Sequence, residues 1–240
     1  MLEFKEIFKK LEFPHRNFSE TSLLKYFLNN DKRVISKWLH YFEVYEFYFD
    51  RLRGKPFRML EIGVNRGGSM QMWKEYFGDQ VEIVGVDISP GCKNLEEEQI
   101  QIRIGDQGDQ GFLRSIKEEY ETFDVIIDDG SHFNDHQILT FKELFSTLTK
   151  NGIYVCEDCH TSYWDDYRGG YKDSRSFIEF SKELIDQVNA YHSKSKPDFS
   201  QDFYTRNIEF IHFYDSMVVF KRSRRSKPFM KKTGQIDWKL

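Results

Sequence analysis

Short apolar segments alternate with amphipathic segments between residues 57 and 221, and this alternation limits the possible folds more than any other feature of the chain. It predicts helices over 67–77, 111–120, 135–148 and 174–191. It predicts strands over 57–62, 81–86, 99–104, 123–127 and 152–156, and a closing hairpin over 207–213 and 216–221. Strands that alternate with helices form a mainly parallel sheet covered on both faces. We therefore predict an α/β fold with a seven-stranded, mainly parallel sheet and an antiparallel edge strand.

Residues 1–53 show apolar residues at helical spacings and no strand-like alternation. We predict two or three helices here, the last ending near Gly54, a residue type that commonly follows a helix. The chain then divides into a helical segment over 1–53 that serves as a lid or interface, a sheet domain over 54–221 and a basic tail over 222–240. The N-terminal helices are a candidate surface for a homo-oligomer, and we expect the tail to be solvated.

The composition excludes several classes of protein. The 240-residue chain is 39% hydrophobic and 17% aromatic, which is enough for a folded core. No apolar stretch approaches the roughly 20 residues of a membrane span, and residues 1–20 lack the apolar core of a signal peptide. The net charge of -4 argues against nucleic acid as a partner, and three scattered cysteines are typical of a reducing compartment. We expect a cytoplasmic protein with no membrane span.

An acidic residue stands at the end of each of the first five predicted strands. These residues are Glu61, Asp87, Asp106, the pair Asp128-Asp129 and the pair Glu157-Asp158. Ligands of open parallel sheets bind beyond the carboxyl ends of the strands. Carboxylates gathered at that edge repel one another unless a cation or a hydroxyl-rich ligand lies between them. Helix capping explains one acid of a pair but not both, so we expect a binding site at this edge.

Glycines follow the first predicted strand, and Gly63 permits the tight turn that brings a ligand close to the backbone. Glu61, just before it, disfavours a dinucleotide pyrophosphate and suits the amino group of a methionine moiety. Asp87 is placed to bind a ribose diol, and Asp106-Gln107 suit the edge of an adenine. In this order along the chain, the residues indicate an adenosyl ligand.

Two further motifs point to a metal ion. Asp129 follows the fourth strand in the segment Asp128-Asp129-Gly130-Ser131-His132, and Glu157-Asp158 follow the fifth strand. Neighbouring parallel strands lie about 4.8 Å apart, so acids at their ends can converge on one cation. Three oxygen ligands without thiolate or imidazole suit Mg²⁺. The sequence therefore predicts a Mg²⁺ site formed by acids at the ends of both strands, with His132 as a functional residue beside it.

A zinc site is an alternative for the same region. His132 and His136 have the spacing of a helical zinc pair, and Cys156, Cys159 and His160 could complete a thiolate–imidazole site. A Cys-x2-Cys pair without a second matching pair argues against this interpretation.

At these residues the sequence resembles the class I S-adenosylmethionine-dependent methyltransferases. It is most similar to the metal-dependent macrocin and mycinamicin sugar O-methyltransferases and their cephalosporin-hydroxylase-like relatives. The similar stretches are LEIGVNRGGSMQMW (60–73), IVGVDISP (83–90), GDQGD (105–109), FDVIIDDGSH (123–132) and YVCEDCHTSYW (154–164). The resemblance implies a Rossmann-like methyltransferase fold over most of residues 31–221. Cys156 and Cys159 depart from it, because they stand where aliphatic residues are expected.

The resemblance also implies a role for each candidate residue. It implies S-adenosylmethionine and Mg²⁺ as cofactors, His132 as the general base, and Asp129, Glu157 and Asp158 as metal ligands. The residues implied to line the S-adenosylmethionine pocket are Glu61, Gly63, Ser69, Asp87, Asp106, Gln107 and Asp128.

The implied reaction is O-methylation of a hydroxyl on a sugar or a sugar-bearing natural product, the small-molecule partner. The metal favours the alkoxide-like form of the hydroxyl, and His132 takes its proton. Tyr163 and Trp164 lie on a segment that is either a lid stacking on the sugar or a loop packed on the N-terminal helices. Two other functions remain open: a catechol-type O-methyltransferase for a small aromatic diol, and a non-catalytic adenosyl-nucleotide-binding protein.

Overall fold

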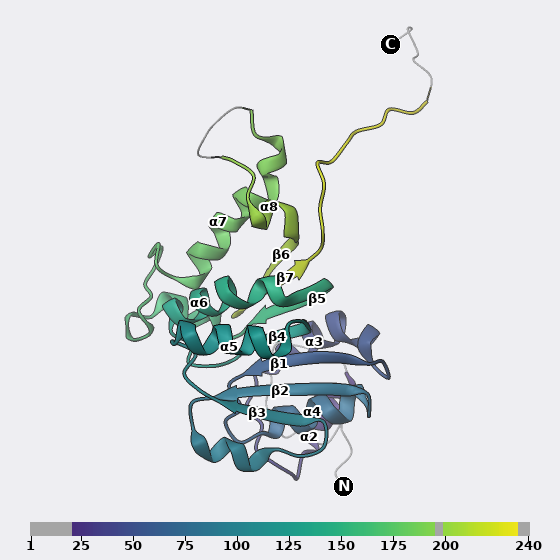
Figure 1. Ribbon diagram of the computed structural model, residues 1–240, viewed down its shortest axis with the longest axis vertical. Helices are drawn as coiled ribbons and strands as arrows, with labels where there is room; N and C mark the ends of the chain where they lie inside the picture. Colours follow the sequence, from purple (N-terminus) through teal and green to yellow (C-terminus); the bar gives the residue numbers. More distant parts are fainter. Residues whose placement is uncertain (1–20, 195–198, 235–240) are drawn as a thin grey trace, which may run out of the picture.

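The computed structural model describes residues 21–194 and 199–234, which form a sheet between two layers of helices (Figure 1). The strands are β1 (Phe57–Ile62), β2 (Val81–Asp87), β3 (Ile100–Ile104), β4 (Phe123–Asp128), β5 (Leu148–Cys156), β6 (Ile208–Tyr214) and β7 (Met217–Arg222). The α-helices are α2 (Ser22–Leu28), α3 (Tyr41–Phe49), α4 (Gly68–Phe77), α5 (Gln110–Tyr120), α6 (Asn134–Leu144), α7 (Phe177–Asn189) and α8 (Phe203–Asn207). Short 3-10 turns span Asp50–Leu52, Pro90–Leu95, Phe145–Thr147, Cys159–Tyr163, Asp165–Tyr167 and Ala190–His192.

The strand order is β3-β2-β1-β4-β5-β7-β6. Strands β1 to β5 pair in parallel, and β7 runs antiparallel between β5 and β6. The predicted fold class is confirmed: the sheet has seven strands, is mainly parallel, and takes its antiparallel pairing from the terminal hairpin. The antiparallel strand lies one position inside the edge, because β6 folds back outside β7.

Alternating side chains on the strands build a core on each face of the sheet. On one face Met59, Ile83 and Val125 pack with α2, α3 and α4. On the other, Leu60 and Ile126 pack with α5, α6 and α7. Burial on both faces explains why these strands are almost continuously apolar. The described N-terminal helices therefore belong to the same core as the sheet.

Several element boundaries differ from the predictions, most clearly between α6 and β5 and at the start of α7. The predicted helix over 135–148 ends at Leu144, and β5 begins at Leu148, because Leu148 pairs with Phe123 of β4. The predicted helix over 174–191 begins at Phe177, since the Ser176 side chain accepts the N–H of Glu179 and caps it. The helical pattern predicted within residues 1–20 lies outside the described residues.

The tail differs from the expected solvated segment at two arginines. Arg222 donates to the carbonyls of Ser146 and Leu148, and Arg225 donates to those of Val188 and Ile208. Beyond them the described chain runs away from the sheet (Figure 1). Within the described ranges, no helix has both the length and the apolar character to cross a bilayer.

Candidate active site

The carboxyl ends of β1 to β4 open into a cavity of about 590 Å³. The strand register aligns these ends, because Ile62 pairs with Val86 of β2 and with Asp128 of β4. Four predicted cofactor residues line the cavity: Gly63, Asp87, Asp106 and Gln107. The other lining residues include Ser36, Asn65, Arg66, Ile88, Ser89, Cys92, Ser131 and the three residues Asp129, His132 and Asp158.

Asp87 and Gly63 shape the turn that forms one wall of this cavity. Asp87 Oδ2 accepts the N–H groups of Val64 at 3.0 Å and Asn65 at 2.9 Å, and its Oδ1 accepts the N–H of Ser89 at 2.8 Å. Gly63 has a φ of 97°, and a Cβ atom there would lie 2.0 Å from the carbonyl oxygen of Asp129. Only glycine fits this position, so the turn after β1 packs directly on the loop after β4.

Three other predicted pocket residues do not line the cavity: Glu61, Ser69 and Asp128. Side chains alternate across the sheet, and Glu61 points toward α4, where it is fully buried beside Ser69. Asp128 is fully buried on the opposite face and accepts from Gln107 Nε2 at 2.6 Å and the Tyr154 hydroxyl at 3.1 Å. These side chains form the wall behind the cavity rather than its lining.

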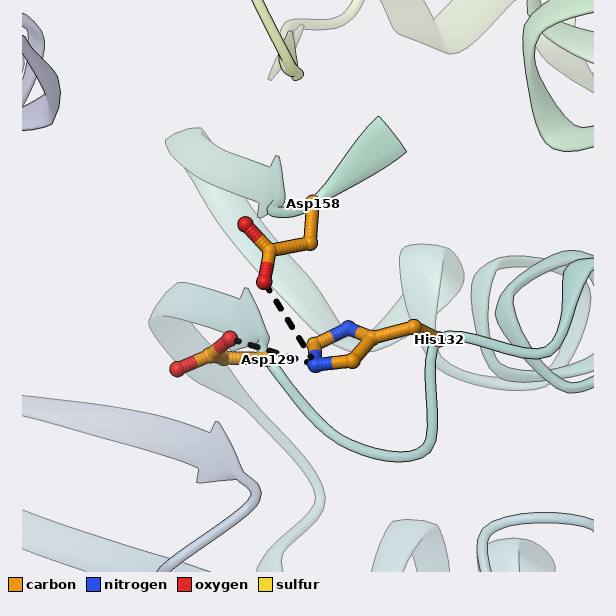
Figure 2. Close-up of side chains that lie close together, drawn as sticks. All are labelled: Asp129, His132 and Asp158. Atoms are coloured by element: carbon orange, nitrogen blue, oxygen red, sulfur yellow. Dashed lines mark ion pairs between the residues drawn. The ribbon is translucent and has the colours of Figure 1, made fainter. Parts of the chain in front are cut away.

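Asp129, His132 and Asp158 converge where the loops after β4 and β5 meet (Figure 2). One potential ligand atom from each lies within 4.8 Å of the others. His132 Nε2 is 3.9 Å from Asp129 Oδ1 and 3.6 Å from Asp158 Oδ2. His132 and Asp158 both have left-handed backbone, at φ 59° and 52°. Such conformations are uncommon outside glycine and concentrate at functional sites.

The second oxygen of each aspartate is held by donors just before α3 and at its first residue. Asp129 Oδ2 accepts from Lys37 Nζ at 2.5 Å. Asp158 Oδ1 accepts from Trp38 Nε1 at 3.0 Å and from the Tyr41 hydroxyl at 2.9 Å. Each carboxylate therefore keeps one oxygen directed toward His132, and the two side chains are fixed in that orientation.

Glu157, the third predicted metal ligand, lies apart from this group. Its side chain is 1% exposed, accepts from the Tyr45 hydroxyl at 2.6 Å and accepts from Lys37 Nζ at 2.8 Å. The left-handed backbone of Asp158 turns the two neighbouring carboxylates in different directions. In the structure, Asp129 and Asp158 therefore lie beside His132, whereas Glu157 forms an ion pair with Lys37.

Lys37 is the residue that the sequence analysis missed. Its side chain is only 3% exposed, and its Nζ lies among the carboxylates of Asp129, Glu157 and Glu61. Burial lowers its pKa, but the surrounding carboxylates raise it more, so the net shift is upward and the ammonium stays charged. The sequence signal for such a residue was the surplus of acids at the strand ends, which requires a cation nearby. Lys37, directly before Trp38, supplies that cation.

Burial also changes the acids around Lys37. Loss of solvation raises the pKa of Glu61 to about 7, and raises the pKa of Glu157, which also faces Asp129, to about 8. Both carboxyls bind protons more tightly in the folded chain than in the unfolded chain, so the folded chain loses stability as the pH rises.

This predicts a pH dependence of stability. The free energy of unfolding should fall as the pH rises from about 4.5 to about 7, with Glu61 contributing up to about 3 kcal/mol. Glu61→Gln should flatten that part of the profile, measured by denaturant unfolding between pH 4 and 8. Glu118→Gln, at an exposed position, is the control. A Glu61→Gln profile as steep as that of the native chain would contradict the assignment.

A second cavity, of about 360 Å³, adjoins the first, and Ser36, Asp129 and Asp158 line both. Lys37, Trp38, Tyr41 and Glu157 complete its lining. Tyr163 and Trp164, predicted to contact the substrate, line neither cavity. Their segment is held on the α6 and α7 side instead, where Asn134 Nδ2 donates to the carbonyls of Thr161 and Tyr167.

The alternative zinc site is not assembled among the described residues. Cys156 and Cys159 are buried and unpaired, and the group of side chains placed to hold a metal consists of Asp129, His132 and Asp158. His136 Nδ1 instead lies 2.9 Å from the Ser131 hydroxyl.

Comparisons with known proteins show which sequences and structures the chain resembles. No protein-family model matches the chain. The 8-demethyl-8-(2-methoxy-alpha-L-rhamnosyl)-tetracenomycin-C 3'-O-methyltransferase of Streptomyces olivaceus is 35% identical over 200 residues, covering 79% of this chain and 51% of that protein. The Mycinamicin VI 2''-O-methyltransferase of Micromonospora griseorubida is 35% identical over 202 residues, covering 79% and 50%. The chain thus spans about half the length of these relatives.

A solved structure of MycE, a methyltransferase from the mycinamycin biosynthetic pathway, in complex with Mg, SAH and Mycinamycin VI, has a TM-score of 0.75 at 31% identity. The structural alignment covers 85% of this chain and 54% of the MycE chain. The chain is therefore a homologue of the sugar O-methyltransferases of macrolide and tetracenomycin pathways, and its sheet domain has their Rossmann-like methyltransferase fold.

Proposed function

We propose that this chain is an S-adenosylmethionine-dependent, Mg²⁺-dependent O-methyltransferase that acts on a hydroxyl of a sugar or of a sugar-bearing natural product. The observation that carries the proposal is the convergence of Asp129, His132 and Asp158 at the junction of two adjoining cavities. The names of the relatives, which are sugar O-methyltransferases, support the substrate class.

The first cavity fits the cofactor. Its volume of about 590 Å³ is within the usual range for small-molecule sites. The Gly63 turn brings backbone to its edge, Asp87 is available to the ribose, and Asp106 with Gln107 borders the place of the adenine. Bound there, S-adenosylmethionine supplies a methyl group already activated by its sulfonium. Glu61, Ser69 and Asp128 would support this cavity from behind.

The donor set of the acidic site fits Mg²⁺. Asp129 and Asp158 each direct one carboxylate oxygen to the same place, and hard divalent ions prefer such oxygens together with water or substrate oxygens. The ion would orient an acceptor hydroxyl and favour its deprotonated form. Glu157 would join the ligands only after its ion pair with Lys37 opens.

His132 is suited to take the proton of the acceptor hydroxyl. Its Nε2 stands beside both aspartates, and it lines the first cavity at the border with the second. Trp38 and Tyr41 give the second cavity aromatic walls, which suit the apolar faces of a sugar ring. Holding the hydroxyl between base and methyl group supplies the alignment that in-line transfer requires.

Removal of the metal tests the proposal. Chelation with EDTA should abolish methyl transfer to deoxysugar-bearing acceptors, followed by mass spectrometry, and added Mg²⁺ should restore it, because the hydroxyl is then bound and deprotonated again. Binding of SAH, measured by calorimetry, should persist without the metal. A catechol acceptor serves as the comparison. Transfer to the catechol alone would favour the aromatic-diol alternative, and SAH binding without any transfer would favour a non-catalytic nucleotide-binding protein.

We further propose a cytoplasmic location, supported by three unpaired cysteines. A homo-oligomer through the N-terminal helices, and a lid role for segment 1–53, stay predictions; within the described part of that segment, Lys37, Trp38 and Tyr41 form a wall of the second cavity.

A further inference from the structure

The ammonium of Lys37 lies among three acidic side chains. Its Nζ lies 2.5 Å from Asp129 Oδ2, 2.8 Å from Glu157 Oε2 and 3.9 Å from Glu61 Oε1. These acids come from three neighbouring strand ends, and the Lys37 and Glu157 side chains are at most 3% exposed. Buried carboxylates of this kind are stable only with a cation among them.

Glu61 is the unsatisfied member of the group. It is fully buried, and neither of its carboxylate oxygens accepts a hydrogen bond of ordinary geometry. A buried acceptor left without a partner is costly. The ammonium of Lys37, at 3.9 Å, is a short shift from full contact with Glu61. The four-carbon stem of lysine is flexible enough to allow such a shift.

The ammonium and a divalent ion compete for the same carboxylates. Lys37 donates hydrogen bonds to Asp129 Oδ2 and Glu157 Oε2. A divalent ion bound between Asp129 and Asp158 would lie close to that ammonium and would also interact with the negative charge of Asp129. Repulsion between two cations at such short range in a buried site is strong. The ion therefore binds best when Lys37 has moved away from Asp129.

We infer that Lys37 is an internal cation that occupies the acidic site in the metal-free chain, and that Glu61 receives its ammonium when a divalent ion displaces it. Displacement would free Glu157 to join Asp129 and Asp158 around the ion. This inference rests on the proposed function, because it concerns the ion of that site. It makes Lys37 a positioning residue that sets metal affinity.

Calorimetric titration with Mg²⁺ in the absence of cofactor tests the competition. Lys37→Met should bind Mg²⁺ about tenfold more tightly than the native chain, because the carboxylates no longer have to be released. Lys37→Arg keeps the cation and should bind no more tightly than the native chain. Lys32→Met, which removes an exposed lysine paired with Glu75, is the matched control and should bind as the native chain does.

Glu61→Gln tests the second position of the ammonium. It should weaken Mg²⁺ binding several-fold in the native background, because the displaced Lys37 loses its acceptor, and have no effect in the Lys37→Met background. An equal effect in both backgrounds would show that Glu61 acts independently of Lys37 and would overturn that part of the inference.

Thermal unfolding provides a readout independent of activity. In EDTA, Lys37→Met should melt below the native chain, since its buried carboxylates lack a counter-charge, and Mg²⁺ should raise its melting temperature more than that of the native chain. If Lys37→Met binds Mg²⁺ equally or more weakly while the native chain binds it, the inference fails and the proposed function stands. If neither chain binds Mg²⁺, the proposed metal site fails, and the inference fails with it.

Discussion

Replacement of His132 by alanine should lower the turnover of methyl transfer by about 10²–10⁴-fold, the usual contribution of a general base. The imidazole lies 3.9 and 3.6 Å from the two aspartates and lines the first cavity, next to Asp129 and Asp158, which line both cavities. Removal of the ring leaves the cofactor walls around Gly63 and Asp87 intact. Turnover should therefore fall while SAH affinity, measured by calorimetry, changes little.

His192→Ala is the control for this substitution, because His192 is exposed in the turn after α7. It should methylate at the native rate. Normal turnover in His132→Ala would show that another group accepts the proton.

Gly63→Ala should destabilise the fold by more than about 3 kcal/mol, the range typical of severe backbone clashes. The added Cβ would lie 2.0 Å from the carbonyl oxygen of Asp129, and the φ of 97° is itself unfavourable for alanine. Relief of the clash requires the loop after β4 to move, and that loop carries Asp129 and His132. We therefore expect a lower melting temperature together with loss of SAH binding.

Gly78→Ala separates the clash from the backbone strain. Gly78 has a similar φ of 90°, and nothing lies within 4 Å of the position of its Cβ. Its cost should be that of the strained backbone alone, about 1–3 kcal/mol. If chemical denaturation gives the same loss of unfolding free energy for Gly63→Ala and Gly78→Ala, the close contact with Asp129 is not what restricts position 63 to glycine.

The fold was predictable because its signals are local. Near-continuous apolar strands such as Val125-Ile126-Ile127 can be buried only between two helical layers, and the structure places them there. The boundary at Leu148 was not predictable in the same way. Its apolar side chain fits a helix or a strand equally well, and the pairing of Leu148 with Phe123 decides between them.

The site was predictable where it follows from strand ends and not where it depends on side-chain direction. Asp129 and Asp158 meet as expected, because parallel strands β4 and β5 end together. The sequence does not show which way each of two consecutive acids faces, so it does not predict the bonds of Glu157 to Lys37 and Tyr45. Lys37 was not predictable in this way, because it lies 92 residues from Asp129 in the sequence, and no local pattern links the two residues.

The central claim is that Asp129 and Asp158 hold one divalent ion beside the cofactor cavity. Crystals grown with SAH and Mn²⁺, which shares the oxygen preference of Mg²⁺, would show the ion by its anomalous scattering. We expect one strong peak about 2.0–2.3 Å from an oxygen of each aspartate and next to His132. A cofactor-bound crystal with no peak there, or with its peak away from these two side chains, would contradict it.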